Sequence, residues 1–141
     1  MAERVAEAPT VGTSVDTLKE RLFNLQASGA TALGPALTAA LAIAGRSAGS
    51  SVILATDGIA NVGLGAMDEL VTDEASAAAE AFYEAAGNAA RDAGVSVSVV
   101  SIAGDDEVKL ELLGRVAELA GGEVDIVEAA QVTSGIFLFR V

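Results

Sequence analysis

Three short apolar runs, separated by longer segments of helical periodicity, constrain the fold of this chain more than any other feature. The runs cover residues 51–56, 95–102 and 124–127, which are lengths typical of strands. Successive strands that are joined through a helix run parallel in one sheet, because the crossover returns the chain to the same starting edge. The sequence therefore predicts an α/β fold of the Rossmann-like, three-layer type, in which helices cover both faces of a parallel sheet.

Four helices are expected around these strands. Ser14 is a good capping residue for the first, and Pro35 suits the first turn of the second, where a missing N–H costs nothing. The run at 51–56 is apolar almost throughout, which predicts a strand that is covered on both faces. The expected helices follow Ser14, begin near Leu33, span residues 74–93, and run from a cap at Asp105 or Asp106 to Gly121.

One domain is expected, from residue 14 to residue 130. Residues 1–13 are weakly patterned and are interpreted as a tail or linker, and residues 131–141 as a C-terminal apolar segment of strong β-propensity. No apolar run approaches the roughly 20 residues that span a bilayer, and the first residues lack the apolar stretch of a signal peptide. An intracellular, cytoplasmic protein without membrane insertion is expected.

The net charge of −12, from 20 acidic and 8 basic residues, limits the partners of this acidic protein. Nucleic acid and acidic membrane surfaces bind clustered Lys and Arg, so neither is expected as a partner. Only 4% of the residues are aromatic, which also disfavours stacking on nucleic-acid bases. Solvated helix faces, a salt-rich source, and an acidic surface for cations or basic partners all stay open as explanations of the acidity.

The chain contains neither His nor Cys, which removes the commonest general base and the thiolate nucleophile. Gly63-Leu64-Gly65 is not followed by the Lys-Ser/Thr of a phosphate loop. A phosphoacceptor receiver domain would need a Lys near the end of a late strand, whereas Lys19 and Lys109, the only lysines, fall in expected helices. No catalytic residue is predicted, and the protein is expected not to be an enzyme.

Polar side chains at the carboxyl ends of the strands are the candidate binding residues, since open parallel sheets bind ligands at that edge. Asp57 directly follows the first strand, and Thr31 lies in the loop ahead of the second helix. Mg²⁺ and Mn²⁺ prefer carboxylate and hydroxyl oxygens, so Thr31 and Asp57 are the predicted metal ligands. The alternative is that Asp57 caps a turn and Thr31 caps a helix. Further polar residues expected near this edge are Ser101, Asp105 and Glu128.

Two segments resemble the metal-ion-dependent adhesion site of von Willebrand factor A domains. Ser28-Gly29-Ala30-Thr31-Ala32-Leu33-Gly34 resembles the second element of that site, and Thr56-Asp57-Gly58 resembles the third. Residues 95–124 are similar to the strand–helix–strand that closes the family's fold. Asn61-Val62-Gly63, with the acidic stretch before Phe82-Tyr83, gives a narrower likeness to the trunk domains of COPII vesicle-coat proteins. The family's Asp-x-Ser-x-Ser run and opening strand are absent, so the resemblance covers residues 14–130.

This resemblance implies a non-enzymatic protein-binding module with an incomplete metal site. Thr31 would be the threonine ligand, and Asp57 would approach the metal. The loops around them would contribute Ser28, Gly29, Gly58 and Asn61. Mg²⁺ or Mn²⁺ would be held weakly by this chain alone, because the absent run supplies the other ligands. The alternative is a structural or assembly domain of the same fold without a working metal site.

The strand at 51–56 lacks a partner at one edge, since the family's opening strand would pair there. An unpaired apolar edge is a template for association. We expect this edge to be completed by another chain, by a self-swapped dimer, or by the Gly135–Val141 segment. The expected partner is therefore a protein or a second copy of this chain in a homo-oligomer.

Overall fold

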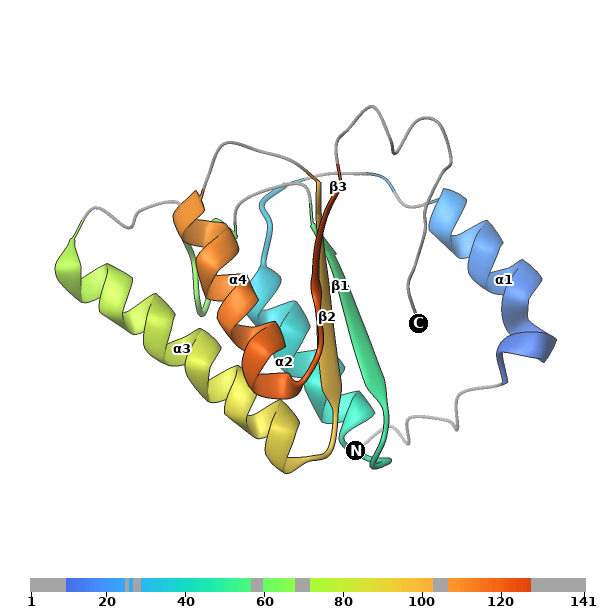
Figure 1. Ribbon diagram of the computed structural model, residues 1–141. Helices are drawn as coiled ribbons and strands as arrows, with labels where there is room; N and C mark the ends of the chain where they lie inside the picture. Colours follow the sequence, from blue (N-terminus) through green and yellow to red (C-terminus); the bar gives the residue numbers. More distant parts are fainter. Residues whose placement is uncertain are drawn as a thin grey trace, which may run out of the picture.

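The computed structural model describes residues 10–24, 26, 29–56, 60–67, 72–102 and 107–127 (Figure 1). In chain order the elements are α1 (Val11–Phe23), α2 (Leu33–Ala44), β1 (Ser51–Thr56), α3 (Asp73–Asp92), β2 (Ser96–Ile102), α4 (Glu107–Ala120) and β3 (Val124–Val127). The alternation of strands and helices from β1 onward confirms the predicted α/β class. Among the described residues, no helix is long and apolar enough to cross a membrane.

The three strands form one parallel sheet in the order β1-β2-β3, as predicted. Ser51 is aligned with Ser96 at one end of the β1–β2 pair, and Thr56 is aligned with Ser101 at the other. This register brings the carboxyl ends of the strands to one edge of the sheet. In the described part of the chain, β1 and β3 are the outer strands.

The core lies between one face of the sheet and the layer formed by α2, α3 and α4 (Figure 1). Alternate residues of a strand point to opposite faces, so Val52 and Leu54 of β1 share a face with Val97 and Val99 of β2. Val97 and Val99 are almost completely buried there. The largest fully buried side chains are Tyr83, Leu37, Met67, Val95, Val97, Val99 and Val116.

The predicted cover on both faces of the sheet is wrong for the described residues. The second face presents Ile53 of β1, which is 63% exposed. α3 packs closely on α4, since a Cβ added at Gly87 would lie only 2.9 Å from the Leu119 Cβ. This contact keeps α3 and α4 together on one side of the sheet. α1 lies on the open side, apart from the strands (Figure 1).

α1 begins earlier than predicted. Thr10 is its N-cap residue, and the Thr10 carbonyl accepts hydrogen bonds from the Thr13 amide at 3.0 Å and from the Ser14 hydroxyl at 2.9 Å. Ser14 therefore lies inside the helix and does not cap it, and residues 11–13 are helical although the sequence suggested a tail. The helix ends at Phe23.

The remaining boundaries agree closely with the predictions. α2 begins at Leu33 and is followed by Gly45, β3 covers the predicted residues, and α3 is shifted by one residue from the predicted span. α3 is capped by Thr72, whose hydroxyl oxygen accepts the Ala75 amide at 3.1 Å. The predicted caps of α4, Asp105 and Asp106, lie outside the described residues, as does the segment 131–141.

Candidate functional site

Two loops meet beyond the carboxyl end of β1 and are joined by reciprocal hydrogen bonds. The Thr31 amide donates to Oδ1 of Asn61 at 2.6 Å, and the Asn61 amide donates to the Thr31 carbonyl at 3.0 Å. The Val62 amide donates to the same carbonyl at 3.3 Å. We refer to this contact between Thr31 and Asn61–Val62 as the Thr31–Asn61 junction. It links the loop before α2 to the loop after β1.

The structure brings together some of the predicted site residues. Thr31 and Asn61 are both exposed and lie at the junction, and Gly29 precedes it with a positive φ of 74°. Thr31 does not cap α2, because the N-cap residue is Ala32. Ser101 is half-buried near the end of β2. The other predicted residues, Ser28, Asp57, Gly58, Asp105 and Glu128, lie outside the described residues.

The loop after β1 is anchored on the core by Tyr83. The Tyr83 side chain is fully buried, and its hydroxyl donates to the Gly65 carbonyl at 2.9 Å. Ala60 and Met67 at the two ends of the loop are also buried, and the Met67 amide donates to the Ala60 carbonyl at 2.6 Å. This anchor was not among the residues predicted from the sequence. Its signal was the single Tyr of the chain, placed in a helix otherwise rich in Ala and Glu.

The glycines of this loop allow tight turns of the backbone and close packing against neighbouring helices. Gly63 and Gly65 both have positive φ, of 84° and 70°. A Cβ at Gly63 would lie 2.9 Å from the Pro35 ring, and a Cβ at Gly65 would lie 2.6 Å from the Phe82 ring. A Cβ at Gly34, in the first turn of α2, would overlap the Leu64 carbonyl. The loop is therefore held against α2 and α3, and its glycines are explained without a bound phosphate.

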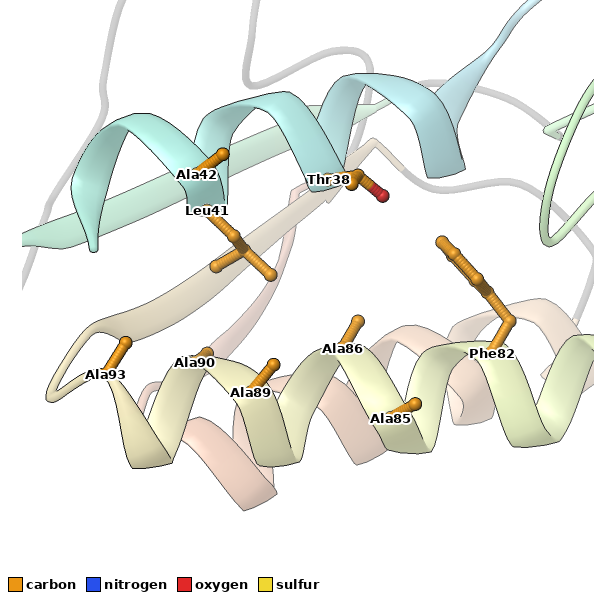
Figure 2. Close-up of a pocket in the computed structure, with 9 residues that line it drawn as sticks. All are labelled: Thr38, Leu41, Ala42, Phe82, Ala85, Ala86, Ala89, Ala90 and Ala93. Carbon is orange, nitrogen blue, oxygen red and sulfur yellow. The ribbon is translucent and has the colours of Figure 1, made fainter. Parts of the chain in front are cut away.

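A groove of about 330 Å³ runs between α2 and α3 (Figure 2). Figure 2 shows Leu41 and Phe82 facing the space between the two helices, with small alanine side chains along α3. The only hydroxyl in its lining is that of Thr38, which donates to the Gly34 carbonyl at 2.9 Å. Because ligand pockets orient their ligands with a few polar groups, this apolar groove is a poor candidate for a catalytic site. It is lined by Thr38, Leu41, Ala42, Phe82, Ala85, Ala86, Ala89, Ala90 and Ala93.

A second groove, between α3 and α4, is lined by four carboxylates, those of Glu80, Glu84, Glu111 and Glu118. Arg115 donates to the Glu118 carboxylate at 2.7 Å, and both side chains are exposed. The hydrogen bond to Glu118 raises the pKa of the Arg115 guanidinium above its ordinary value. No polar or charged side chain is buried among the described residues. In that part of the chain, the acidity therefore resides on solvated surfaces.

The described residues contain no group of three or more acidic, His or Cys side chains that could hold a metal ion. Thr31 offers an exposed hydroxyl at the junction. Asp57 is the next residue after Thr56, the last residue of β1. A metal at this edge would therefore take few ligands from the chain and most from water or from a bound ligand.

No family model matches the chain. The chain is similar to the Circularly permutated Ras protein 1 of Dictyostelium discoideum, with 34% identity over 128 residues. The aligned region is 91% of this chain but 15% of that relative, so the chain spans less than a sixth of the protein it matches. A parallel α/β sheet is compatible with a Ras-like fold as well as with other Rossmann-like folds.

This finding contradicts the resemblance to von Willebrand factor A domains and the narrower likeness to COPII trunk domains. The relative bears the name of a Ras protein, and the similarity runs through both segments on which the resemblance was based. Two functions were inferred from that resemblance, an adhesion-type binding module and a structural domain of the same fold. Both are contradicted by the same finding. Because the relative bears the name of a Ras protein, the expectation that the protein is not an enzyme is contradicted as well.

Proposed function

We propose that this chain is part of a Ras-type, GTP-hydrolysing switch protein and forms the Mg²⁺ side of its guanine-nucleotide site. The observation that carries the proposal is the 34% identity, over 91% of the chain, to a circularly permutated Ras protein. Because the chain spans only 15% of that relative, GTP hydrolysis belongs in this proposal to the longer protein. The chain would contribute one part of the site.

The position of the Thr31–Asn61 junction supports this role. Parallel α/β sheets bind nucleotides beyond the carboxyl ends of their strands, where loops supply the ligand contacts. The junction lies at that edge and holds two loops in a fixed relation through three hydrogen bonds. Tyr83 and the close contact at Gly34 fix the second loop on the core. A loop held in this way can position a ligand with little loss of conformational entropy on binding.

The chemistry of Thr31 and Asp57 suits a nucleotide-bound Mg²⁺. In phosphate-loop GTPases the Ser or Thr of the phosphate loop and an Asp after an apolar strand hold the metal, which also contacts phosphate oxygens. Asp57 follows the apolar strand β1 in the sequence and matches that Asp, and Thr31 offers a further hydroxyl from the neighbouring loop. Mg²⁺ usually binds one or two protein groups and fills its other positions with water and phosphate oxygens. Mn²⁺ accepts the same ligands.

The phosphate-binding loop would come from outside these 141 residues. The sequence has no Gly-x-x-x-x-Gly-Lys-Ser/Thr pattern, and neither of its lysines follows a glycine pair. The glycines at 63 and 65 are occupied by packing against Pro35 and Phe82. The net charge of −12 repels free phosphates. We therefore expect weak nucleotide binding by this chain alone, with a strict requirement for Mg²⁺.

Titration with a fluorescent GTP analogue, with and without Mg²⁺, tests the proposal. Binding should require Mg²⁺ and should weaken at least about tenfold, or roughly 1.4 kcal/mol, in Asp57→Asn. Asp125→Asn is the matched control, since it makes the same change at an exposed residue within β3. Its affinity should stay within about twofold of the wild type, well under 1 kcal/mol. No binding at millimolar GTP with Mg²⁺, or equal losses in the two variants, would refute the proposal.

A further inference from the structure

The sheet has one face that no helix covers in the described part of the chain. This open face consists of Ser51, Ile53 and Ala55 of β1 and the residues of β2 and β3 that point to the same side of the sheet. Ile53 is 63% exposed, although it lies in the middle of a strand. Parallel sheets are normally covered on both faces, so an open apolar face is unusual. Its apolar members are the exposed Ile53 and Ala55, the half-buried Ile102 and Val127, and Val100, which is only 8% exposed.

Helix α1 carries a matching apolar stripe that contacts little. Val15, Leu18 and Leu22 recur at helical spacing and are 38%, 51% and 66% exposed. The hydrogen bonds that the described residues of α1 make stay within residues 10–24. Figure 1 shows α1 on the same side of the sheet as the open face, separated from it.

We propose that α1 packs onto the open face of the sheet in its own chain and completes a third layer of the fold. The 13 residues of α1 make a helix of about 20 Å. The six residues of β1 extend over about the same length. Residues 24–32 connect α1 to α2 and can span up to about 30 Å when extended. The helix can therefore reach the open face without disturbing α2.

The charges on α1 favour the same arrangement. Lys19 follows Val15 by one helical turn and borders the apolar stripe, whereas Asp16 and Glu20 lie on the flank further from it. The open face carries the exposed Asp125 on β3. A helix seated with its apolar stripe on the sheet would bring Lys19, and not Glu20, toward the strands. Docking therefore adds no like-charge contact at this face.

Docking of α1 would also act on the Thr31–Asn61 junction. The chain passes from Phe23, the last residue of α1, directly through the loop that contains Thr31. Restraining the helix restrains this loop, whose amide at Thr31 is bonded to Asn61. Docking of α1 would thus reduce the motion of the loop that contains Thr31, whatever ligand binds at the junction.

The absence of Cys from the sequence allows a clean cross-linking test. Leu18→Cys with Ile53→Cys joins the two proposed faces at positions that are exposed in the structure, so folding should be preserved. Glu20→Cys with Ile53→Cys is the control, because Glu20 lies on the other flank of the helix. A disulfide needs Cα atoms within about 7 Å. Under mild oxidation the first pair should form an intramolecular disulfide at least about tenfold faster than the control.

Two results would overturn the inference. Equal rates for the two pairs would mean that α1 does not dock through its apolar stripe. Cross-linked dimers without cross-linked monomers would assign the open face to α1 of a second copy.

Thiol labelling of Ile53→Cys gives an independent measurement. Adding Leu18→Asp should raise the labelling rate about fivefold, which corresponds to a loss of roughly 1 kcal/mol in the free energy of docking. Adding Glu20→Asp, the matched control, should leave the rate unchanged. An unchanged rate in both double variants would contradict docking of α1 on this face.

Discussion

Replacing Tyr83 with Phe removes one hydroxyl from the centre of the molecule and leaves the ring in place. The ring is fully buried and meets Phe82 edge-on, with centroids 5.1 Å apart. The hydroxyl makes a single described contact, a 2.9 Å hydrogen bond to the Gly65 carbonyl. Tyr83→Phe therefore tests how strongly the core holds the loop after β1.

The expected loss of stability follows from this hydrogen bond. A hydrogen bond within a protein contributes about 0.5–1.5 kcal/mol net, and an acceptor left without a partner costs about 1–3 kcal/mol. The Gly65 carbonyl lies in a half-buried loop, where water can replace part of the lost contact. We expect Tyr83→Phe to lower the free energy of unfolding by about 1–2 kcal/mol at neutral pH.

Burial of the Tyr83 hydroxyl makes stability depend on pH in the alkaline range. Burial raises the pKa of Tyr83 from 10.0 to about 12. The folded state therefore keeps the phenol proton at pH values where the unfolded state has lost it. This contribution is fully present below pH 10 and is lost as the pH rises from 10 toward 12, amounting to about 1–2 kcal/mol after screening. Tyr83→Phe lacks this titration, so its stability should approach that of the wild type in this window.

Urea unfolding followed by circular dichroism measures both effects. Wild type and variant are compared at pH 7 and at steps up to pH 11, and absorbance of the single tyrosine reports its ionisation directly. Equal stability at pH 7, or ionisation of the folded protein near pH 10, would refute the anchoring of the loop by Tyr83.

Three further substitutions test other contacts. Gly34→Ala forces a Cβ onto the Leu64 carbonyl and should cost about 1–3 kcal/mol of unfolding free energy, with broadened NMR signals of the Thr31–Asn61 junction. Thr72→Ala removes the cap of α3 and should cost about 1 kcal/mol, measured by thermal unfolding. Arg115→Ala breaks an exposed ion pair with Glu118 and should leave the midpoint of thermal unfolding unchanged. A large effect in this last variant would contradict its assignment to a solvated surface.

The strands and helices could be predicted because their signals are local. Apolar periodicity and the glycines after α2, α3 and α4 placed most elements within a residue or two. The start of α1 differs from the prediction because its N-cap residue, Thr10, makes no side-chain capping hydrogen bond, and its backbone carbonyl instead accepts hydrogen bonds from the first turn. Every residue has a backbone carbonyl, so the residue types do not indicate which carbonyl will accept these hydrogen bonds.

The cover of the sheet could not be predicted from the apolar run at 51–56. Such a run shows that both faces of a strand are apolar, but not which helix covers each face. The choice depends on contacts between distant residues, such as the close approach of Gly87 to Leu119. The exposed Ile53 is the result.

The binding site stays a prediction, although two of its residues meet in the structure. Thr31 was identified from its place between glycines, and the structure joins it to Asn61, which was named as a loop residue. The inference from those motifs to a protein family was wrong, because an acidic residue after an apolar strand is common to many α/β sheets. Local geometry of this kind indicates where a ligand binds, but the sequence similarity to a Ras protein bears on which ligand it is.

The central claim is that a Mg²⁺–guanine nucleotide binds at the carboxyl end of the sheet. Amide chemical shifts of the ¹⁵N-labelled protein, recorded during titration with Mg²⁺–GTP, test this claim most directly. Amides of Gly29, Thr31 and Asn61 should shift together, whereas Ser51 and Ser96 at the opposite end of the strands should not. The absence of any shift at saturating Mg²⁺–GTP, or shifts confined to the groove between α2 and α3, would contradict the account.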